Sequence, residues 1–222
     1  MLPSSIRYVS FDCYGTLTDF RIGQLTERLF ADRVTEPAMD AFIEDFSAYR
    51  FDEVLGSWKP YPQVLHDALE RTCGKWNLRF TSDDVEKIVD AVPTWGPHED
   101  VPAALAKVAQ ALPLVILSNA SDNQIQSNVK KLGAPCYAVL TAEQAHAYKP
   151  RLCAFEYMFD TLGCGPEHFL HVSSSLRCDL MSAHDLRIAG RVFVNRGHGP
   201  GNPSYGYHEI QHLGGLPALM GL

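Results

Sequence analysis

The chain has 222 residues, which is enough for one large domain or a core with an insertion and too short for a multidomain array. Apolar residues make up 46% and charged residues 20%, a globular composition that excludes disorder, collagen and low complexity. The formal net charge is −7 and no window collects basic residues, so we expect no nucleic-acid partner.

The cysteines and the N-terminal residues bear on the compartment. Six cysteines are scattered without a CxxC pair, and the first residues lack the basic and long apolar regions of a signal peptide. We therefore expect reduced thiols in a cytoplasmic protein. The longest strongly apolar stretch, 111–117, is far shorter than the roughly 20 residues that span a bilayer, so we expect no membrane association.

Short apolar runs that end in small or polar residues predict strands buried on both faces. The runs cover 6–12, 112–119, 168–175 and 191–197, with a shorter one at 136–140. Helical spacing of apolar residues predicts helices at 97–112 and 153–163. Buried strands that alternate with helices are typical of a parallel sheet, so we predict an α/β core.

The first predicted strand is separated from the second by about 90 residues, whereas a crossover needs only about a dozen. This stretch predicts helices at 37–56, 61–76 and 82–92, the last of which opens with acidic residues in its first turn. We therefore predict an all-helical insertion at 20–95, with 1–19 and 96–222 forming the core. The Gly/Pro-rich segment 197–206 predicts a surface loop.

Polar residues end several of the predicted strands, where open parallel sheets bind their ligands. They are Asp12, Ser118, Asn119 and the serines at 173–175. An Asp in such a place can simply cap a turn. Here Lys149 lies between these strand ends in sequence, and Asp179 follows them. This order indicates a carboxylate nucleophile with a cationic orienter, a hydrogen-bonding loop and a further acid.

The sequence resembles the haloacid dehalogenase superfamily and, within it, the L-specific (type II) 2-haloacid dehalogenases. The resemblance covers nearly the whole chain and is carried by FDCYGTL (11–17), LSNAS (117–121), YKP (148–150) and HVSSSLRCD (171–179). It implies a Rossmann-like core with a mobile helical cap over the active site. It also implies a hydrolase that needs no cofactor and converts short 2-haloalkanoic acids to 2-hydroxy acids. The oligomeric state, a homodimer included, stays open.

The resemblance also implies roles for individual residues. Asp12 is expected to be the nucleophile, Lys149 to orient it, and Asp179 to fill the last acidic position. In the dehalogenases an aromatic-Arg pair on the first long cap helix binds the leaving halide, and Tyr49-Arg50 matches that place. An Arg on a helix is, however, more often a solvated surface residue. The residues expected to contact the substrate are Tyr14, Thr16, Arg50, Ser118, Asn119, Phe155, Ser174 and Ser175, while Trp58 and Trp95 either line the pocket or pack in the core.

Two positions favour dehalogenation over phosphoryl transfer. Phosphatases of the superfamily carry a second Asp where this chain has Tyr14, and a phenol with a pKa near 10 is a poor proton donor at neutral pH. They also carry a magnesium-binding Asp where this chain has Ser174. We therefore expect no metal, and a metal-dependent phosphatase is the alternative enzyme.

Two departures from the dehalogenases leave the substrate open. Phe155 replaces a Tyr of well-studied members, and the fourth motif is one residue longer than theirs. Another activated 2-substituted acid, such as azetidine-2-carboxylate, and an inactive binding-only protein are the further alternatives. We expect Cys13 to be a small core residue, and His98, His146 and His171 to have hydrogen-bonded structural roles.

Overall fold

The computed structural model describes residues 2–222, and the chain divides into two compact units. One unit consists of Met1–Asp19 with Gly96–Leu222, and the other of Phe20–Trp95. Within the described residues, no helix combines the length and the apolar character needed to cross a membrane. The action of the helical unit as a mobile cap stays a prediction.

The core unit contains a six-stranded, all-parallel sheet in the order β3-β2-β1-β4-β5-β6. Its strands are β1 (Tyr8–Phe11), β2 (Leu114–Ser118), β3 (Ala138–Thr141), β4 (Phe169–Ser173), β5 (Gly190–Val194) and β6 (His208–Ile210). This confirms the predicted α/β fold with a Rossmann-like parallel sheet. The strand β6 was not predicted, because it is a three-residue edge strand whose residues are largely exposed.

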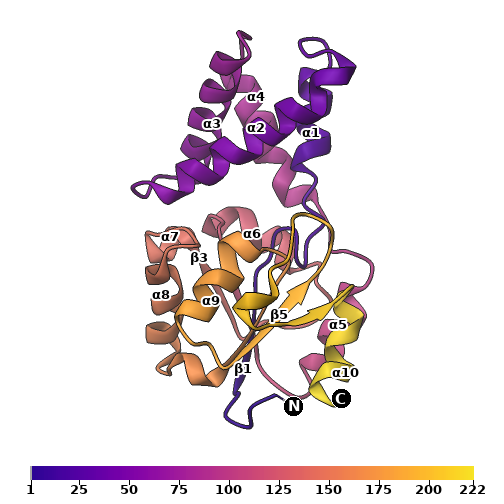
Figure 1. Cartoon of the computed structure of the whole chain (residues 1–222), viewed down its shortest axis with the longest axis vertical. Coiled ribbons are helices and arrows are strands. Elements are labelled where there is room, and N and C mark those ends of the chain that lie inside the picture. The colour runs from indigo at the N-terminus through magenta and orange to yellow at the C-terminus, as the bar shows by residue number, and fades with distance from the viewer. Residues whose placement is uncertain (1) are drawn as a thin grey trace. The chain divides into compact units, whose positions relative to one another are not determined.

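Each face of the sheet is covered by helices, which is why the strands are apolar at consecutive positions. Val9 and Phe11 of β1 belong to a buried cluster with α5 (Val101–Val108), α6 (Asp122–Val129) and α10 (Leu216–Met220). On the other face, Tyr8 packs in a cluster with α8 (Leu152–Leu162) and α9 (Met181–Asp185). Figure 1 shows α8 and α9 on one side of the sheet and α5 and α10 on the other.

Short elements connect the strands and helices. They are α7 (Ala142–Ala145), the 3₁₀ turns η1 (Val92–Thr94), η2 (Pro166–His168), η4 (Pro203–Tyr205) and η5 (Leu213–Gly215), and the π-helical turn η3 (Leu176–Leu180). Helices α5 and α8 confirm two predicted segments. The others are too short or too polar to show a clear helical period in the sequence.

The second unit consists of four helices, α1 (Ile22–Phe30), α2 (Glu36–Leu55), α3 (Tyr61–Lys75) and α4 (Ser82–Ala91). Three of them match predicted helices to within one residue at each end. Helix α1 was not predicted, and no side chain caps its N-terminus at Arg21. The unit has an apolar core of its own, in which Phe30, Phe42 and Leu69 are fully buried.

Asp84 joins two helices of this unit. It completes a capping box with Thr81 at the start of α4, and it accepts two hydrogen bonds of 2.9 Å from Arg33, which follows α1. The hydrogen bonds from Arg33 lower the pKa of Asp84. An ionised, bidentate pair of this kind is stronger than a neutral hydrogen bond.

We predict that Asp84→Asn lowers the free energy of unfolding by about 1.5–3 kcal/mol at pH 7, because it removes hydrogen bonds to a charged partner. The pKa of Asp84 is lower in the folded chain, so the pair contributes fully above the ordinary value of 3.8 and is lost as the pH falls through the lowered value. Urea denaturation at several pH values measures both effects. The exposed Asp83→Asn is the matched control, with an expected loss of about 0.5 kcal/mol or less, and equal losses would contradict this account.

Candidate active site

The core unit brings three charged side chains together at the carboxyl end of its sheet. Lys149 Nζ donates to Asp12 Oδ1 at 2.9 Å and to Asp179 Oδ1 at 2.6 Å. Asp12 directly follows β1, Asp179 lies in η3 after β4, and Lys149 lies in the loop between α7 and α8. The Lys149 side chain is only 1% exposed, although it is charged. The structure thus brings the three predicted catalytic residues into contact, while their roles stay predictions.

The loop after β1 gives each oxygen of Asp12 a hydrogen-bond donor. Thr16 Oγ1 donates to Asp12 Oδ2 at 2.6 Å, while Oδ1 faces Lys149. The chain turns back at Gly15, whose φ of +88° is unfavourable for a residue with a side chain. Ser174 N donates to Thr16 Oγ1 at 2.8 Å. Thr16 therefore orients Asp12, and Ser174 supports Thr16.

The backbone of Lys149 is held on both sides by one amide side chain. Asn119, which follows β2, accepts from Lys149 N at 2.7 Å and donates to Lys149 O at 2.8 Å. Ser182 Oγ of α9 donates to Pro150 O at 2.6 Å. The structure therefore gives Asn119 a role in positioning Lys149, and its predicted contact with the substrate stays a prediction.

Asp179 lies in the wide turn η3, in which Leu180 N donates to Ser175 O at 3.3 Å. A π-helical turn accommodates one residue more than an α-helical turn, so the longer fourth motif still brings Asp179 to Lys149. The Ser175 hydroxyl caps this turn by accepting from Cys178 N at 3.0 Å. The structure thus uses Ser175 as a cap, whereas we expected it to contact the substrate.

One residue of the cluster was missed by sequence reasoning. His171 of β4 is fully buried, with Nε2 2.9 Å from Asp179 Oδ1 and Nδ1 2.9 Å from Ser10 Oγ. We had expected a structural role alone for this residue. The sequence does carry a signal for this contact. A histidine within an apolar strand that is buried on both faces needs hydrogen-bond partners, because an unpaired buried polar group costs free energy.

Phe155 lies below the site and not on its surface. Its side chain is fully buried in the apolar cluster of α8, and its ring meets the His171 ring edge-on with centroids 5.3 Å apart. The predicted contact of Phe155 with the substrate is therefore replaced by packing in the core. Cys13 is also buried in the core, as expected.

Two further predicted residues differ in what their hydroxyls offer. Ser118, the last residue of β2, has a buried Oγ with no hydrogen-bond partner within residues 2–222. Tyr14 OH donates to Asn128 Oδ1 of α6 at 3.1 Å. The Ser118 hydroxyl therefore has no partner in the described chain, whereas that of Tyr14 contacts α6, and the substrate contacts of both residues stay predictions.

Burial and the charges of neighbouring groups together set the pKa values of the cluster. Burial raises the pKa of Asp12, against the opposing effect of the Lys149 ammonium. Burial acts in the same direction on Asp179, but Lys149 and His171 outweigh it and lower the pKa. Burial acts to lower the pKa of Lys149, and the two carboxylates reverse this effect and raise it. Asp12 is therefore the carboxylate of the cluster that is more easily protonated.

The donor set at this site does not suit Mg²⁺. Magnesium prefers several carboxylate oxygens and waters in octahedral geometry. Here the Lys149 ammonium already lies between the two carboxylates, and Ser174 offers a hydroxyl in place of a third. Over the part of the chain that is described, the one group of side chains with spacing for an ion is His66, Asp67 and Glu70 of α3, in the helical unit.

Arg50 lies in the helical unit and is not a fully solvated side chain. Its guanidinium carbon lies 5.2 Å from the Phe46 ring centroid and 5.8 Å from that of Phe20. Its Nε is buried and has no hydrogen-bond partner among the described residues. Trp95 is buried edge-on against Phe20 with centroids 5.0 Å apart. Arg50 therefore stays a candidate for the predicted halide contact.

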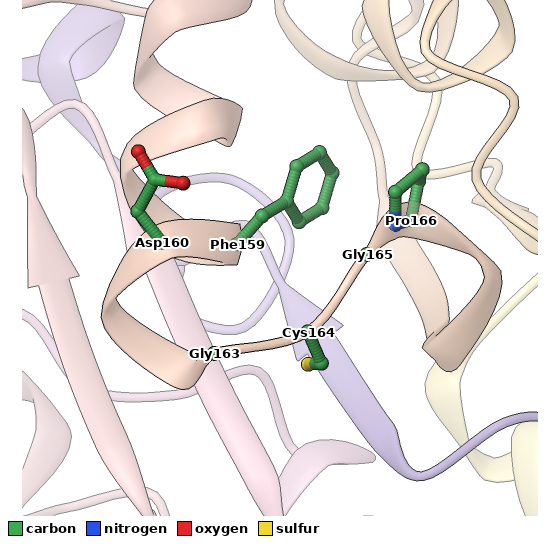
Figure 2. A pocket seen from close by; sticks show the side chains of 6 residues that line it. All are labelled: Phe159, Asp160, Gly163, Cys164, Gly165 and Pro166. Atoms are coloured by element: carbon green, nitrogen blue, oxygen red, sulfur yellow. The ribbon is translucent and has the colours of Figure 1, made fainter.

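A shallow hollow of about 430 Å³ lies at the other end of the core sheet, between α8 and β4. Figure 2 shows its lining, which consists of Phe159, Asp160, Gly163, Cys164, Gly165 and Pro166. This hollow precedes the amino end of β4, whereas the cluster of Asp12 lies at the carboxyl ends of the strands. The hollow is therefore separate from the candidate active site.

We predict opposite effects on stability for the two carboxylates. The pKa of Asp12 is higher in the folded chain, so its deprotonation lowers stability as the pH rises from its ordinary value through the raised one. Asp12→Asn should therefore leave the melting temperature at pH 7 unchanged or raise it, with a gain that disappears in acid. Asp179→Asn should cost about 3–5 kcal/mol, because Asp179 is the carboxylate whose pKa Lys149 and His171 lower, so its ionised form is strongly paired in the folded chain. Thermal unfolding from pH 4 to 8 measures both variants, and a large loss for Asp12→Asn would contradict the account.

Known proteins resemble this chain in sequence and in fold. An (S)-2-haloacid dehalogenase of Pseudomonas sp. (strain CBS-3) is 30% identical over 77% of this chain and 76% of its own length. An L-2-haloacid dehalogenase of Xanthobacter autotrophicus, solved with chloropropionic acid covalently bound, has a TM-score of 0.76 at 20% identity over 97% of this chain and 98% of that one.

The fold is shared by a protein with a metal as well. A putative hydrolase of the same superfamily from Bacillus subtilis, bound to magnesium, has a TM-score of 0.81 at 16% identity over 98% of this chain and 99% of that one. The fold alone therefore does not separate metal-dependent from metal-independent chemistry. The model of the haloacid dehalogenase-like hydrolases matches residues 6–186, which confirms the resemblance seen in the motifs. The chain belongs to the haloacid dehalogenase-like hydrolase family.

Proposed function

We propose that this protein hydrolyses short 2-haloalkanoic acids to 2-hydroxy acids through a covalent ester of Asp12. The observation that carries this proposal is the buried Asp12 carboxylate, held by Lys149 and Thr16 where a metal-dependent relative would need further carboxylates. The relatives named as haloacid dehalogenases support the same substrate class. Asp12, Lys149 and Asp179 form the proposed catalytic set.

In the first step, an oxygen of Asp12 attacks the carbon that bears the halogen. A new carbon–oxygen bond forms as the carbon–halogen bond breaks, and the halide leaves with the bonding electrons. Water solvates a free carboxylate strongly and weakens it as a nucleophile, and burial removes that solvation. Lys149 and Thr16 orient the two oxygens, which reduces the entropic part of the barrier.

In the second step, a water molecule attacks the ester carbonyl carbon of Asp12. Asp179 Oδ1 is taken by Lys149 and His171, while Oδ2 is buried with no hydrogen-bond partner within residues 2–222. We assign to Oδ2 the acceptance of the proton from that water. The ester C–O bond then breaks, and the departing alkoxide takes the proton from Asp179 to give the 2-hydroxy acid. Asp12 loses the second proton of the water to solvent and returns to its carboxylate form with one oxygen from water.

The substrate carboxylate needs hydrogen-bond donors beside Asp12. We assign this role to Ser118, whose buried hydroxyl has no partner over the described range, with Ser174 as a second donor. A buried hydroxyl without a partner costs free energy, and a bound carboxylate would satisfy it. The helical unit is proposed to act as the cap, with Arg50 as the donor to the departing halide.

Isotope labelling tests the covalent ester. With excess enzyme in ¹⁸O water, a single turnover of 2-chloropropionate should place the label in Asp12 before any appears in lactate. Asp12→Asn should release no halide above background, because its amide does not form the ester, and its unchanged fold is checked by circular dichroism. Direct incorporation of the label into the product would show that water attacks the substrate instead.

The same assay separates the alternatives. Halide release should persist in EDTA, whereas a phosphatase would lose activity and regain it with Mg²⁺. A panel with azetidine-2-carboxylate beside chloro- and bromoacids distinguishes ring opening from dehalogenation. An inactive member of the family would turn over no compound of the panel.

We predict that Arg50→Ala slows dehalogenation of a chloroacid by about two to three orders of magnitude, because preorganised donors to a developing charge are worth about 3–4 kcal/mol. The loss should affect kcat as well as KM, and it should be smaller for a bromoacid, whose leaving group needs less help. Arg50→Lys should rescue only part of the rate. The exposed Arg28→Ala on α1 is the matched control. Normal kinetics for Arg50→Ala would remove this residue from the chemistry.

A further inference from the structure

We propose that His171 is a positioning residue that orients Asp179 for hydrolysis of the ester. This inference rests on the function proposed above. His171 lies below Asp179, and no role in the steps described so far has been given to it. Its two ring nitrogens contact Asp179 and Ser10, each at 2.9 Å. The side chain is therefore held at both ends.

The strand register explains how the imidazole comes to this place. Ser10 of β1 and His171 of β4 are direct partners across two parallel strands, so their side chains lie on the same face of the sheet. The rest of this face is apolar, with Tyr8 and Phe169 in its buried cluster. An imidazole buried among such residues costs free energy unless both nitrogens have partners. Ser10 and Asp179 meet that need.

The contact also determines which oxygen of Asp179 is left for water. Lys149 and His171 both bind Oδ1, and their positions restrain the rotation of the carboxylate group. Oδ2 remains buried with no hydrogen-bond partner in the described chain. Without the imidazole, the carboxylate would be free to turn about its contact with Lys149, and Oδ2 would not be fixed for the proposed acceptance of the proton.

The ring itself is immobilised by packing. Phe155 of α8 meets it at an interplanar angle of 72°, with centroids 5.3 Å apart. Both rings are fully buried. Since a contact held by rigid neighbours loses little entropy on each turnover, the geometry suits a residue that positions another.

The two chemical steps depend on His171 differently. Ester formation uses Asp12 and Lys149, which His171 does not touch, whereas ester hydrolysis uses Asp179. Because halide release is the first irreversible step, kcat/KM reports ester formation, and single-turnover hydrolysis reports the second step. Loss of His171 should therefore slow the second step selectively.

Rapid-quench kinetics with 2-chloropropionate measure whether ester hydrolysis is slowed selectively. The variants are His171→Phe and His171→Gln. We expect ester hydrolysis to slow by about 10- to 100-fold in His171→Phe, with halide release changed by less than about threefold. A burst of halide equal to the enzyme concentration and a trapped Asp12 ester, detected by mass spectrometry, should follow. His171→Gln, whose amide can donate to Asp179, should recover part of the rate. His168→Gln, in the turn η2 just before β4, is the matched control.

The outcomes separate the two proposals. Equal slowing of both steps, or unchanged hydrolysis, in a folded His171 variant would overturn the positioning role while the dehalogenase function stands. No halide release from the wild-type protein would overturn the function. In that case, NMR tests the contact of His171 with Asp179 without turnover. The ¹⁵N chemical shifts of the His171 imidazole should change in Asp179→Asn and stay constant in His168→Gln. Constant shifts in Asp179→Asn would overturn the contact.

Discussion

The Lys149 ammonium, shared by Asp12 and Asp179, is the interaction on which the site depends. It joins the end of β1, the loop before α8 and the turn after β4, which are far apart in sequence. Burial of an ammonium is costly unless its partners compensate, and here two carboxylates do so. Burial raises the pKa of Asp12, and Asp179 acts in the same direction against Lys149, because the cluster carries more negative than positive charge. The same imbalance leaves Asp12 less strongly paired and more reactive than it would be in a closed ion pair.

The sheet supports this cluster with a mostly apolar interior. On the face covered by α8, aromatic residues fill much of the buried core. Ser10 and His171 form a hydrogen-bonded polar pair between this core and Asp179. Both side chains of this pair have hydrogen-bond partners, so few buried polar groups are left unsatisfied where the core meets the site. Ser118 Oγ and Asp179 Oδ2 are the exceptions nearest the site, and both are assigned to the substrate or water.

The sequence predicted the parallel core and the meeting of Asp12, Lys149 and Asp179, because strands buried on both faces are continuous apolar runs and their carboxyl ends share one edge. It did not reveal which polar groups pair with each other. Asn119 was expected at the substrate and holds the Lys149 backbone, and Ser175 caps a turn. Such pairings depend on where each loop places its side chains to within a few ångströms. Neither the composition nor the spacing of apolar residues predicts this. The contact of His171 with Asp179 was missed for the same reason.

A carboxylate held by an ammonium suits attack on carbon better than transfer of a phosphoryl group. A phosphoryl group carries its own negative charge, so a catalyst must bring cations to its oxygens, usually as Mg²⁺. Here the buried Lys149 ammonium is bound between two carboxylates. A 2-haloacid as substrate requires less positive charge, because it has a single carboxylate, which we assigned to hydroxyl donors such as Ser118, and its reacting carbon is neutral. For the proposed reaction, a desolvated and oriented nucleophile is therefore of more use than a metal.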